Sequence, residues 1–599
     1  MTNAQKDDDH TFKMPAPAEV GQAIMDAYEK AQPLLEQYLS KLSNPETIKE
    51  LSSVNFDPLN VQQSYIDFVD KVIQEPDKFM EIQAGYMKDW MNLWQDSLSQ
   101  FMGGAQDNAP QDYDRRFKAE EWNESAVFNF IKQSYLLTCK HIETTLDSVE
   151  ISEEQKKKLK FQSKLFSDAL SPTNFAMTNP DVLNETVKTG GQNLVKGFEN
   201  LLNDLGRGNG GLNISTTNYD AFELGKNIAV TKGSVVCQND LMQLIQYAPK
   251  TDKTFKTPLL IIPPWINKYY ILDLREGNSL VEWLVEQGHT VFMISWVNPD
   301  AELAQKKFED YMQSGILDAL LHIEQTTGET ECNAIGYCLG GTLLTSTMAY
   351  LTKKNQSNRI KSATFLTTLL DFEHAGDMKL FLDDTQLDKI DKMMEKHGVL
   401  DGKELQQTFS LMRANDLIWS FVVNNYLMGR EPFPFDLLYW NDDSTNMPAA
   451  MQHYYLRNMY RDNKLIEADS LQMLGENIDI RNINTPCHFI STKEDHIAPW
   501  KATYAGAKIL GDNVTFTLAA SGHIAGVVNS PVKNKYCYWV NDTIVNDEDK
   551  WFEGAKQHEG SWWPEWQRWA NAYTGEKVEA RKVKKELEPA PGSYVKKRI

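Results

Sequence analysis

The sequence predicts a mostly helical N-terminal domain followed by a larger α/β domain built on a mainly parallel sheet. Three observations support this fold class. The 599 residues exceed what one hydrophobic core normally organises, the first third shows helical apolar spacing, and the remainder alternates short apolar runs with helical segments. Glycines within 206–211 mark the expected boundary. We therefore assign residues 1–205 to the helical domain and 212–599 to the α/β domain.

Composition excludes several classes of protein. The chain is 41% hydrophobic and 24% charged, as in an ordinary folded protein. Its formal net charge of −22 disfavours nucleic acid as a partner. Apolar runs fall short of the roughly 20 residues that span a bilayer, and the Asp-rich N-terminus lacks the pattern of a secretory signal. The six cysteines form no CxxC pair. We expect a cytoplasmic protein without a transmembrane segment, disulfide framework or metal ion.

In the N-terminal domain, the stretch 86–102 carries its apolar residues on one helical face. These residues are Met87, Trp90, Met91, Trp94, Leu98, Phe101 and Met102. Such a face is typical of a helix that packs into the core of its domain. The alternative is a surface for an amphipathic partner or an apolar particle, to which Met and Trp are suited.

In the α/β domain, six apolar runs predict strands, with helices such as 303–325 between them. The runs are 259–262, 290–296, 332–337, 360–367, 487–491 and 514–518. Between the fourth and fifth of them lies a long insertion, about 373–484, rich in aromatic residues and Met. Insertions of this length usually have a function. We expect this one to form a lid over the site.

The segment Gly336 to Gly341, which directly follows the third predicted strand, has the pattern of a nucleophile elbow. This is the sharp strand-to-helix turn of α/β-hydrolases, here with Cys338 where most such enzymes have serine. Small flanking residues are needed because the backbone is strained and the helix packs closely under the strand. A buried cysteine in a Gly-rich turn is also common without catalysis. As a functional motif, it predicts an α/β-hydrolase fold and acyl chemistry through a thioester.

In this fold the nucleophile is followed along the chain by an acid and then by a histidine. Asp495 follows the fifth predicted strand and His523 follows the sixth. Cys338, Asp495 and His523 are therefore the candidate catalytic triad. Asp371, after an earlier strand, is the competing acid, and we interpret His496 as a neighbour that shapes the loop around Asp495.

Cysteine chemistry sets further requirements. A thiol with the ordinary pKa near 8.5 is mostly protonated at neutral pH, so His523 must deprotonate Cys338 or hold it as an ion pair. The expected oxyanion donors are the backbone N–H of Leu339 and one from the loop after residues 259–262. Prolines occupy the first two positions of that loop, so the second donor is Trp265 or Ile266. Because a thioester stays activated toward an alcohol, cysteine favours transfer over hydrolysis.

Seven long motifs occur in the order found in one family, and from about Arg115 to its end the sequence resembles the class I polyhydroxyalkanoate synthases. The motifs are Pro263 to Tyr270, Gly336 to Gly341, Phe435 to Asn441 with Asp443, Thr445 and Asn446, Asp495 to Ile497, Ser521 to Gly526, Gly560 to Pro564, and Pro591 to Val595.

The resemblance implies an acyltransferase that polymerises (R)-3-hydroxyacyl-CoA, such as 3-hydroxybutyryl-CoA and similar short-chain monomers, with release of CoA and without a cofactor. It implies that Cys338 carries the growing chain, that His523 activates the thiol, and that Asp495 helps to activate the 3-hydroxyl. The residues by themselves also allow Asp495 to orient His523, and both roles stay open. The resemblance further implies a homodimer on cytoplasmic polymer granules, alongside granule-associated proteins.

Two other functions are alternatives: a thioesterase or lipase-like hydrolase on the same fold, and a non-enzymatic granule-coating protein that uses the Trp90 and Trp94 face.

Aromatic residues of the insertion are candidates for lining an acyl channel, with ordinary lid packing as the other interpretation. They are Trp419, Phe421, Phe433, Phe435 and Trp440. The sequence predicts neither the preferred monomer length nor the CoA-binding residues, because no phosphate-binding Gly-rich loop or basic cluster is evident.

Overall fold

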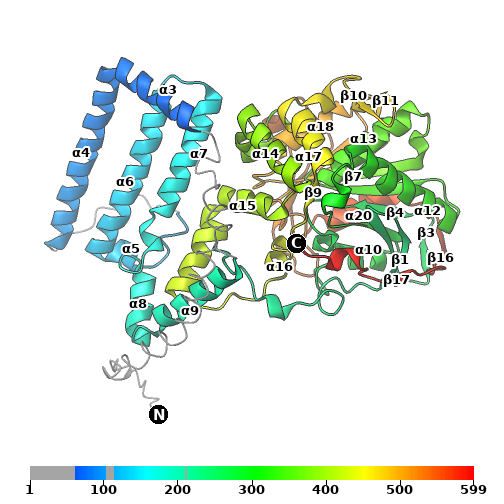
Figure 1. The fold of residues 1–599 in the computed structure, drawn as a ribbon, viewed down its shortest axis with the longest axis horizontal. Coiled ribbons are helices and arrows are strands. Elements are labelled where there is room, and N and C mark those ends of the chain that lie inside the picture. Colours follow the sequence, from blue (N-terminus) through cyan, green and yellow to red (C-terminus); the bar gives the residue numbers. More distant parts are fainter. Residues whose placement is uncertain (1–60, 103–113, 209–211) are drawn as a thin grey trace, which may run out of the picture. The chain divides into compact units, whose positions relative to one another are not determined.

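The computed structural model describes residues 61–102, 114–208 and 212–599, with side chains from Ser64 onward. The chain divides into two compact units, each described by itself (Figure 1). The helical unit comprises Met1–Asn218 and Phe409–Phe433, and the α/β unit comprises Tyr219–Thr408 and Pro434–Ile599. Within the described ranges, no helix is long and apolar enough to cross a membrane.

The longer helices of the helical unit pack side by side, with α4 against α6 and α6 against α7 (Figure 1). Its helices are α3 (Val61–Gln74), α4 (Pro76–Phe101), α5 (Glu121–Glu124), α6 (Ala126–Ser148), α7 (Glu153–Ala169), α8 (Pro180–Thr189) and α9 (Gln192–Arg207). Helix α7 begins with a capping box, in which Ser152 and Gln155 satisfy each other's backbone N–H groups. Trp122 of α5 and Leu159 of α7 are among the buried core residues of the helical unit.

The predicted amphipathic stretch 86–102 lies in α4, but its apolar face is not a core face. Only Trp90 is half-buried, where it packs edge-on against Phe130 of α6. The other six residues are more than half exposed, Trp94 at 60% and Met102 at 75% for example. The expectation of core packing is therefore wrong for most of this face, because the stripe is wider than the line of contact with α6.

One part of the expected lid belongs to the helical unit. Residues 409–433 contain two π-helical turns, η8 (Asn415–Trp419) and η9 (Val422–Leu427), and η9 packs on α9. A Cβ added to Gly197 of α9 would lie 1.8 Å from the carbonyl oxygen of Tyr426, so only glycine permits this approach. The Tyr426 hydroxyl also donates to Asp204 at 2.6 Å. Residues 212–218 likewise lie in this unit, beyond the expected boundary.

The α/β unit is built on an 11-stranded mixed sheet with the order β15-β14-β13-β12-β7-β6-β4-β5-β2-β1-β17. The six predicted strands form its parallel centre. They are β4 (Leu259–Ile262), β5 (Val291–Trp296), β6 (Cys332–Tyr337), β7 (Ile360–Leu366), β12 (Cys487–Thr492) and β13 (Val514–Ala519). The antiparallel edges, which the sequence did not indicate, are β1 (Gly233–Gln238), β2 (Met242–Tyr247), β14 (Cys537–Val540), β15 (Lys556–Glu559) and β17 (Glu588–Pro589).

Helices pack on the parallel strands, and α13 is almost entirely buried. Helix α13 (Leu339–Lys353) follows β6 and contacts β4, β6 and β7, and twelve of its residues are buried. Helices α10 (Leu280–Gln287) and α18 (Trp500–Ile509) pack on β5 and on β12 and β13. The α/β-hydrolase fold expected from the elbow is thereby confirmed, with the elbow at the central strand β6.

The rest of the insertion between β7 and β12 stays in the α/β unit. It contains α14 (Asp384–His397), α16 (Asp436–Asn441), α17 (Ala449–Tyr455) and the hairpin of β10 (Leu471–Met473) and β11 (Glu476–Ile478). Its base is tied by two hydrogen bonds of 2.8 Å, in which the amide of Asn463 donates to Asp371 and accepts from the Phe372 N–H. A later part of the insertion is thus joined to the segment by which the chain leaves β7.

Candidate active site

Cys338 occupies the sharp turn between β6 and α13 with φ 51° and ψ −119°. A non-glycine residue in this region costs about 1–3 kcal/mol and persists only where its surroundings hold it. Here the Cys338 N–H donates to the Leu366 carbonyl at 2.8 Å, and the Thr368 hydroxyl donates to the Cys338 carbonyl at 3.2 Å. The strained geometry projects the thiol beyond the end of the strand, as the elbow motif predicts.

The glycines of the motif are required by close backbone contacts. A Cβ at Gly336 would lie 2.4 Å from the Cα of Gly341, and one at Gly340 would lie 2.1 Å from the carbonyl oxygen of Ile262. The second contact has a functional consequence. It brings the loop after β4, the expected source of an oxyanion donor, directly against the turn that carries Cys338.

Asp495 and His523 lie in the loops after β12 and β13 and form a buried pair. His523 Nδ1 and Asp495 Oδ2 are 2.7 Å apart. The other oxygen of Asp495 accepts the backbone N–H groups of Ile497 and Ala498, each at 2.9 Å, and the Thr492 hydroxyl donates to Oδ2 at 3.1 Å. Four donors therefore hold the carboxylate in one orientation toward the imidazole.

The Cys338 sulfur completes this arrangement, because it acts on the His523 side chain and helps to raise the pKa of the imidazole. Because Nδ1 is engaged by Asp495, Nε2 is the ring nitrogen available to sulfur. Burial alone would lower the pKa of His523, but the Asp495 carboxylate and the Cys338 sulfur outweigh it and raise that pKa to about 10. The imidazole is thus suited to remain protonated beside a thiolate, which is the active form of a cysteine nucleophile.

The predicted oxyanion donors are consistent in position with that role, which stays a prediction. Leu339 is the first residue of α13, so its N–H has no acceptor within the helix. Trp265 and Ile266 are buried in the loop after β4. The Ile266 carbonyl accepts the Thr445 N–H at 3.2 Å, which ties this loop to the insertion.

Two tyrosines that the sequence did not single out also lie near the sulfur. Burial raises the pKa of both Tyr455 and Tyr460 above the usual value. Tyr460 and Cys338 add to the effect on Tyr455, and Cys338 and Asp495 add to the effect on Tyr460. Both tyrosines come from α17 and the turn after it, and their rings meet edge to face at 5.7 Å. Trp265 and Phe372 pack against Tyr455 at 5.5 and 6.1 Å. No spacing rule marks these residues, because their neighbourhood to Cys338 depends on how the insertion folds back.

The proposed channel residues do not all lie in one unit of the chain. Trp440 donates its indole N–H to the Lys268 carbonyl at 2.6 Å, and Phe435 is 40% exposed at the start of α16. Trp419 lies in η8 of the helical unit. The hydrogen bond of Trp440 therefore supports lid packing, while the channel assignment stays a prediction.

The two competing loop residues have other contacts. The Asp371 carboxylate accepts from Asn463 and from the Glu373 N–H, and so serves the base of the insertion. The His496 carbonyl lies against Gly376, where a Cβ would approach it to 2.5 Å. Asp495 is therefore the acid that the geometry pairs with His523.

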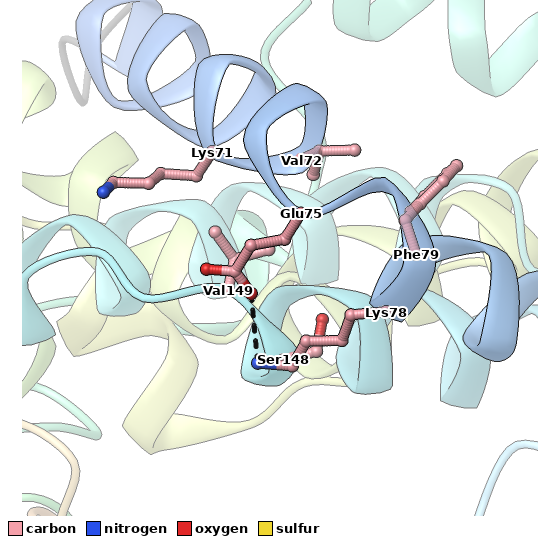
Figure 2. Close-up of a pocket in the computed structure, with 7 residues that line it drawn as sticks. All are labelled: Lys71, Val72, Glu75, Lys78, Phe79, Ser148 and Val149. Carbon is pink, nitrogen blue, oxygen red and sulfur yellow. Dashed lines mark hydrogen bonds and ion pairs between the residues drawn. The ribbon is translucent and has the colours of Figure 1, made fainter.

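A small surface pocket in the helical unit is formed where α3 and α4 meet the end of α6 (Figure 2). Its lining residues are Lys71, Val72, Glu75, Lys78, Phe79, Ser148 and Val149. The dashed line in Figure 2 marks the contact of Lys78 with Glu75, at 3.5 Å. Its lining includes none of Cys338, Asp495 and His523, and we assign it no role in the chemistry.

Comparison with known proteins gives two family matches and several relatives that align with most of this chain. Residues 113–284 match the N-terminal region of poly-beta-hydroxybutyrate polymerase, and residues 257–530 match the alpha/beta hydrolase fold. The chain is 44% identical over 532 residues to the poly(3-hydroxyalkanoate) polymerase subunit of Rhizobium meliloti (strain 1021), covering 88% of this chain and 87% of that one.

A second relative is the poly(3-hydroxyalkanoate) polymerase of Methylorubrum extorquens, 45% identical over 533 residues and 88% of both chains. Among solved structures, a bromoperoxidase from Bacillus anthracis matches with a TM-score of 0.30 and 13% identity. That match covers 49% of this chain and 94% of the other.

Proposed function

This chain belongs to the poly(3-hydroxyalkanoate) polymerases, and from that premise we propose that it joins (R)-3-hydroxyacyl units from CoA thioesters through a covalent thioester on Cys338. The observation that carries this proposal is Cys338 at the elbow of β6 together with the hydrogen-bonded pair of His523 and Asp495, whose imidazole pKa Cys338 helps to raise. It supplies a nucleophile, a proton carrier and a group that holds the carrier in place.

In the first step, the Cys338 thiolate attacks the carbonyl carbon of the acyl-CoA. The negative charge that develops on the carbonyl oxygen is met by the N–H of Leu339 and by that of Trp265 or Ile266. Collapse of the tetrahedral intermediate expels the CoA sulfur, which takes the proton from the His523 imidazolium. The products are an acyl-Cys338 thioester, free CoA and a neutral imidazole.

In the second step, the 3-hydroxyl of another hydroxyacyl unit attacks a Cys338 thioester. His523, now neutral, accepts the hydroxyl proton while the new ester bond forms and the cysteine sulfur leaves as a thiolate. This returns the imidazolium–thiolate pair, so no further reactant is consumed. Asp495 can activate that hydroxyl or orient His523, and its hydrogen bond to His523 is compatible with either role.

A hydrolase on the same fold would use the same first step but let water accept the acyl group. The two are separated by supplying 3-hydroxybutyryl-CoA and measuring CoA release together with insoluble polyester and free 3-hydroxybutyrate. We expect polyester to account for most of the CoA released. Stoichiometric free acid without polymer would instead identify a thioesterase.

We further propose that the enzyme needs no metal ion or cofactor, acts as a homodimer and sits on cytoplasmic polymer granules. The exposed Met and Trp stripe of α4 supports attachment to an apolar polymer surface.

Two measurements test the other points. Unchanged turnover after dialysis against EDTA would support metal independence, and light scattering on the protein as it elutes from a size-exclusion column gives the oligomeric state. Loss of activity on dialysis, restored by one metal ion, would overturn the first point.

A further inference from the structure

Lys268 is a buried cation, with its side chain only 2% exposed. Its ammonium donates to the backbone carbonyls of Val595 at 2.7 Å and Lys597 at 2.6 Å, and lies 3.5 Å from Asp443 Oδ1. Burial lowers the pKa of Lys268, and the Asp443 carboxylate opposes that shift. Burying a charge costs free energy unless the charge is paired and hydrogen-bonded. The Lys268 ammonium therefore requires these carbonyls and the Asp443 carboxylate to stay in place.

The partners of Lys268 come from the 593–598 segment, which is anchored on both sides of it. The Tyr594 hydroxyl donates to the Asn239 carbonyl at 2.6 Å. The Lys597 ammonium, in contrast, reaches the surface, where its ion pair with Asp300 contributes little to holding the segment. Arg598 lies 3.9 Å from Asp443 and stacks over the ring of Tyr439. The segment is therefore packed into the α/β unit with its carbonyls aimed at the ammonium.

The backbone around Lys268 is held from the opposite direction by the insertion. The Lys268 carbonyl accepts the indole N–H of Trp440, and the Ile266 carbonyl accepts the N–H of Thr445. Asp443, the counter-ion of Lys268, also comes from this stretch and accepts the Tyr270 hydroxyl at 2.9 Å. Residues 265–268 are thus fixed between the insertion and the 593–598 segment.

We propose that Lys268 is a positioning residue that sets the oxyanion loop of the polymerase through the 593–598 segment. Trp265 and Ile266, the candidate donors, precede it by three and two residues, so the ammonium and its carbonyl acceptors determine where their N–H groups point. This rests on the proposed function, because it requires an oxyanion to form at Cys338. Errors of about 1 Å in such a donor cost on the order of 100-fold in rate.

The test compares three changes in the full protein: Lys268→Met, a chain that stops after Lys596, and Lys597→Ala as the matched control. Lys268→Met removes the donor, and the shortened chain removes the Lys597 carbonyl and Arg598. Lys597→Ala removes the surface ion pair with Asp300 but retains the carbonyl that Lys268 uses. The readouts are kcat and KM for CoA release, Tm, and hydrogen exchange of the backbone amides of 265–267.

We expect Lys268→Met and the shortened chain each to lower kcat about tenfold or more, with KM changed by less than about threefold, because a weakened oxyanion donor acts on the transition state. Amides 265–267 should exchange faster in both, and Lys597→Ala should match the wild type. The combined change should be no slower than the slower single change, because both act through one contact. If Lys268→Met does not fold, the shortened chain decides by the same readouts.

Unchanged kcat, an effect confined to KM, or unaltered exchange at 265–267 would overturn the proposal. So would an equal loss in Lys597→Ala. The exchange measurement does not depend on the reaction, whereas Cys338→Ala tests the chemistry alone. A failure of the positioning role is therefore distinguishable from a failure of the proposed function.

Discussion

Asp495 and His523 meet through a 2.7 Å hydrogen bond at a site where both side chains are almost entirely buried. A carboxylate so placed fixes the tautomer and the orientation of the imidazole and favours its protonated form. The ring therefore presents an N–H toward Cys338. Because of this hydrogen bond, His523 can act as a general acid that protonates the leaving CoA thiolate, and also as a general base.

Replacing the nucleophile tests the first step. Cys338→Ala should lower CoA release from 3-hydroxybutyryl-CoA by about 10³-fold or more, because no other group can form the thioester. Thiol released into solution is the direct measurement. Cys537→Ala is the matched control, since that cysteine is also free but lies on β14, and it should retain the wild-type rate. An undiminished rate in Cys338→Ala would overturn the proposed chemistry.

The raised pKa of His523 predicts how stability depends on pH. Below about pH 6.5 the imidazole is protonated in both folded and unfolded chains, so its stabilising contribution is fully present. Between pH 6.5 and about 10 the unfolded chain loses the proton while the folded chain keeps it, so the contribution falls as pH rises. The Tm of the wild type should exceed that of His523→Gln more at pH 6 than at pH 10. A Tm difference independent of pH would contradict the shift.

Asp495→Asn separates the two roles of the carboxylate. If Asp495 activates the 3-hydroxyl, the variant should still release about one CoA per active site in a single turnover but should form little polymer. We expect this outcome. The measurements are rapid-quench CoA release and polyester yield on the same preparation. If single-turnover release falls as severely as polymer formation, orientation of His523 is the better account.

The exposed stripe of α4 predicts binding to the polymer surface. Trp94→Glu with Leu98→Glu should reduce sedimentation of the enzyme with polyester granules roughly tenfold or more, since each buried side chain of this size contributes about 2 kcal/mol. Asn92→Glu with Ser99→Glu adds the same charge to exposed positions outside the stripe. This control should sediment like the wild type, and equal losses in both would point to charge alone.

Local patterns predicted much of the α/β unit. Buried parallel strands are continuous apolar runs, so β4, β5, β6, β7, β12 and β13 were all identified with bounds close to those observed. The antiparallel edge strands were not identified, because β15 and β17 are short and polar, and β1 and β2 interrupt their apolar residues with polar ones. The exposure of the α4 stripe was also mispredicted, since periodicity shows that a face exists but not whether another element covers it.

The sequence by itself determined the order of nucleophile, acid and histidine, and the glycines that allow the Cys338 turn, because these depend on local sterics and on strand order. Only the tertiary structure decided which residues surround them. Tyr455 approaches Cys338 and the 593–598 segment holds Lys268 through contacts between distant parts of the chain. Likewise, residues 409–433 join α9 through Gly197. Such contacts follow from packing and buried hydrogen bonds, which leave no periodic signal in the sequence.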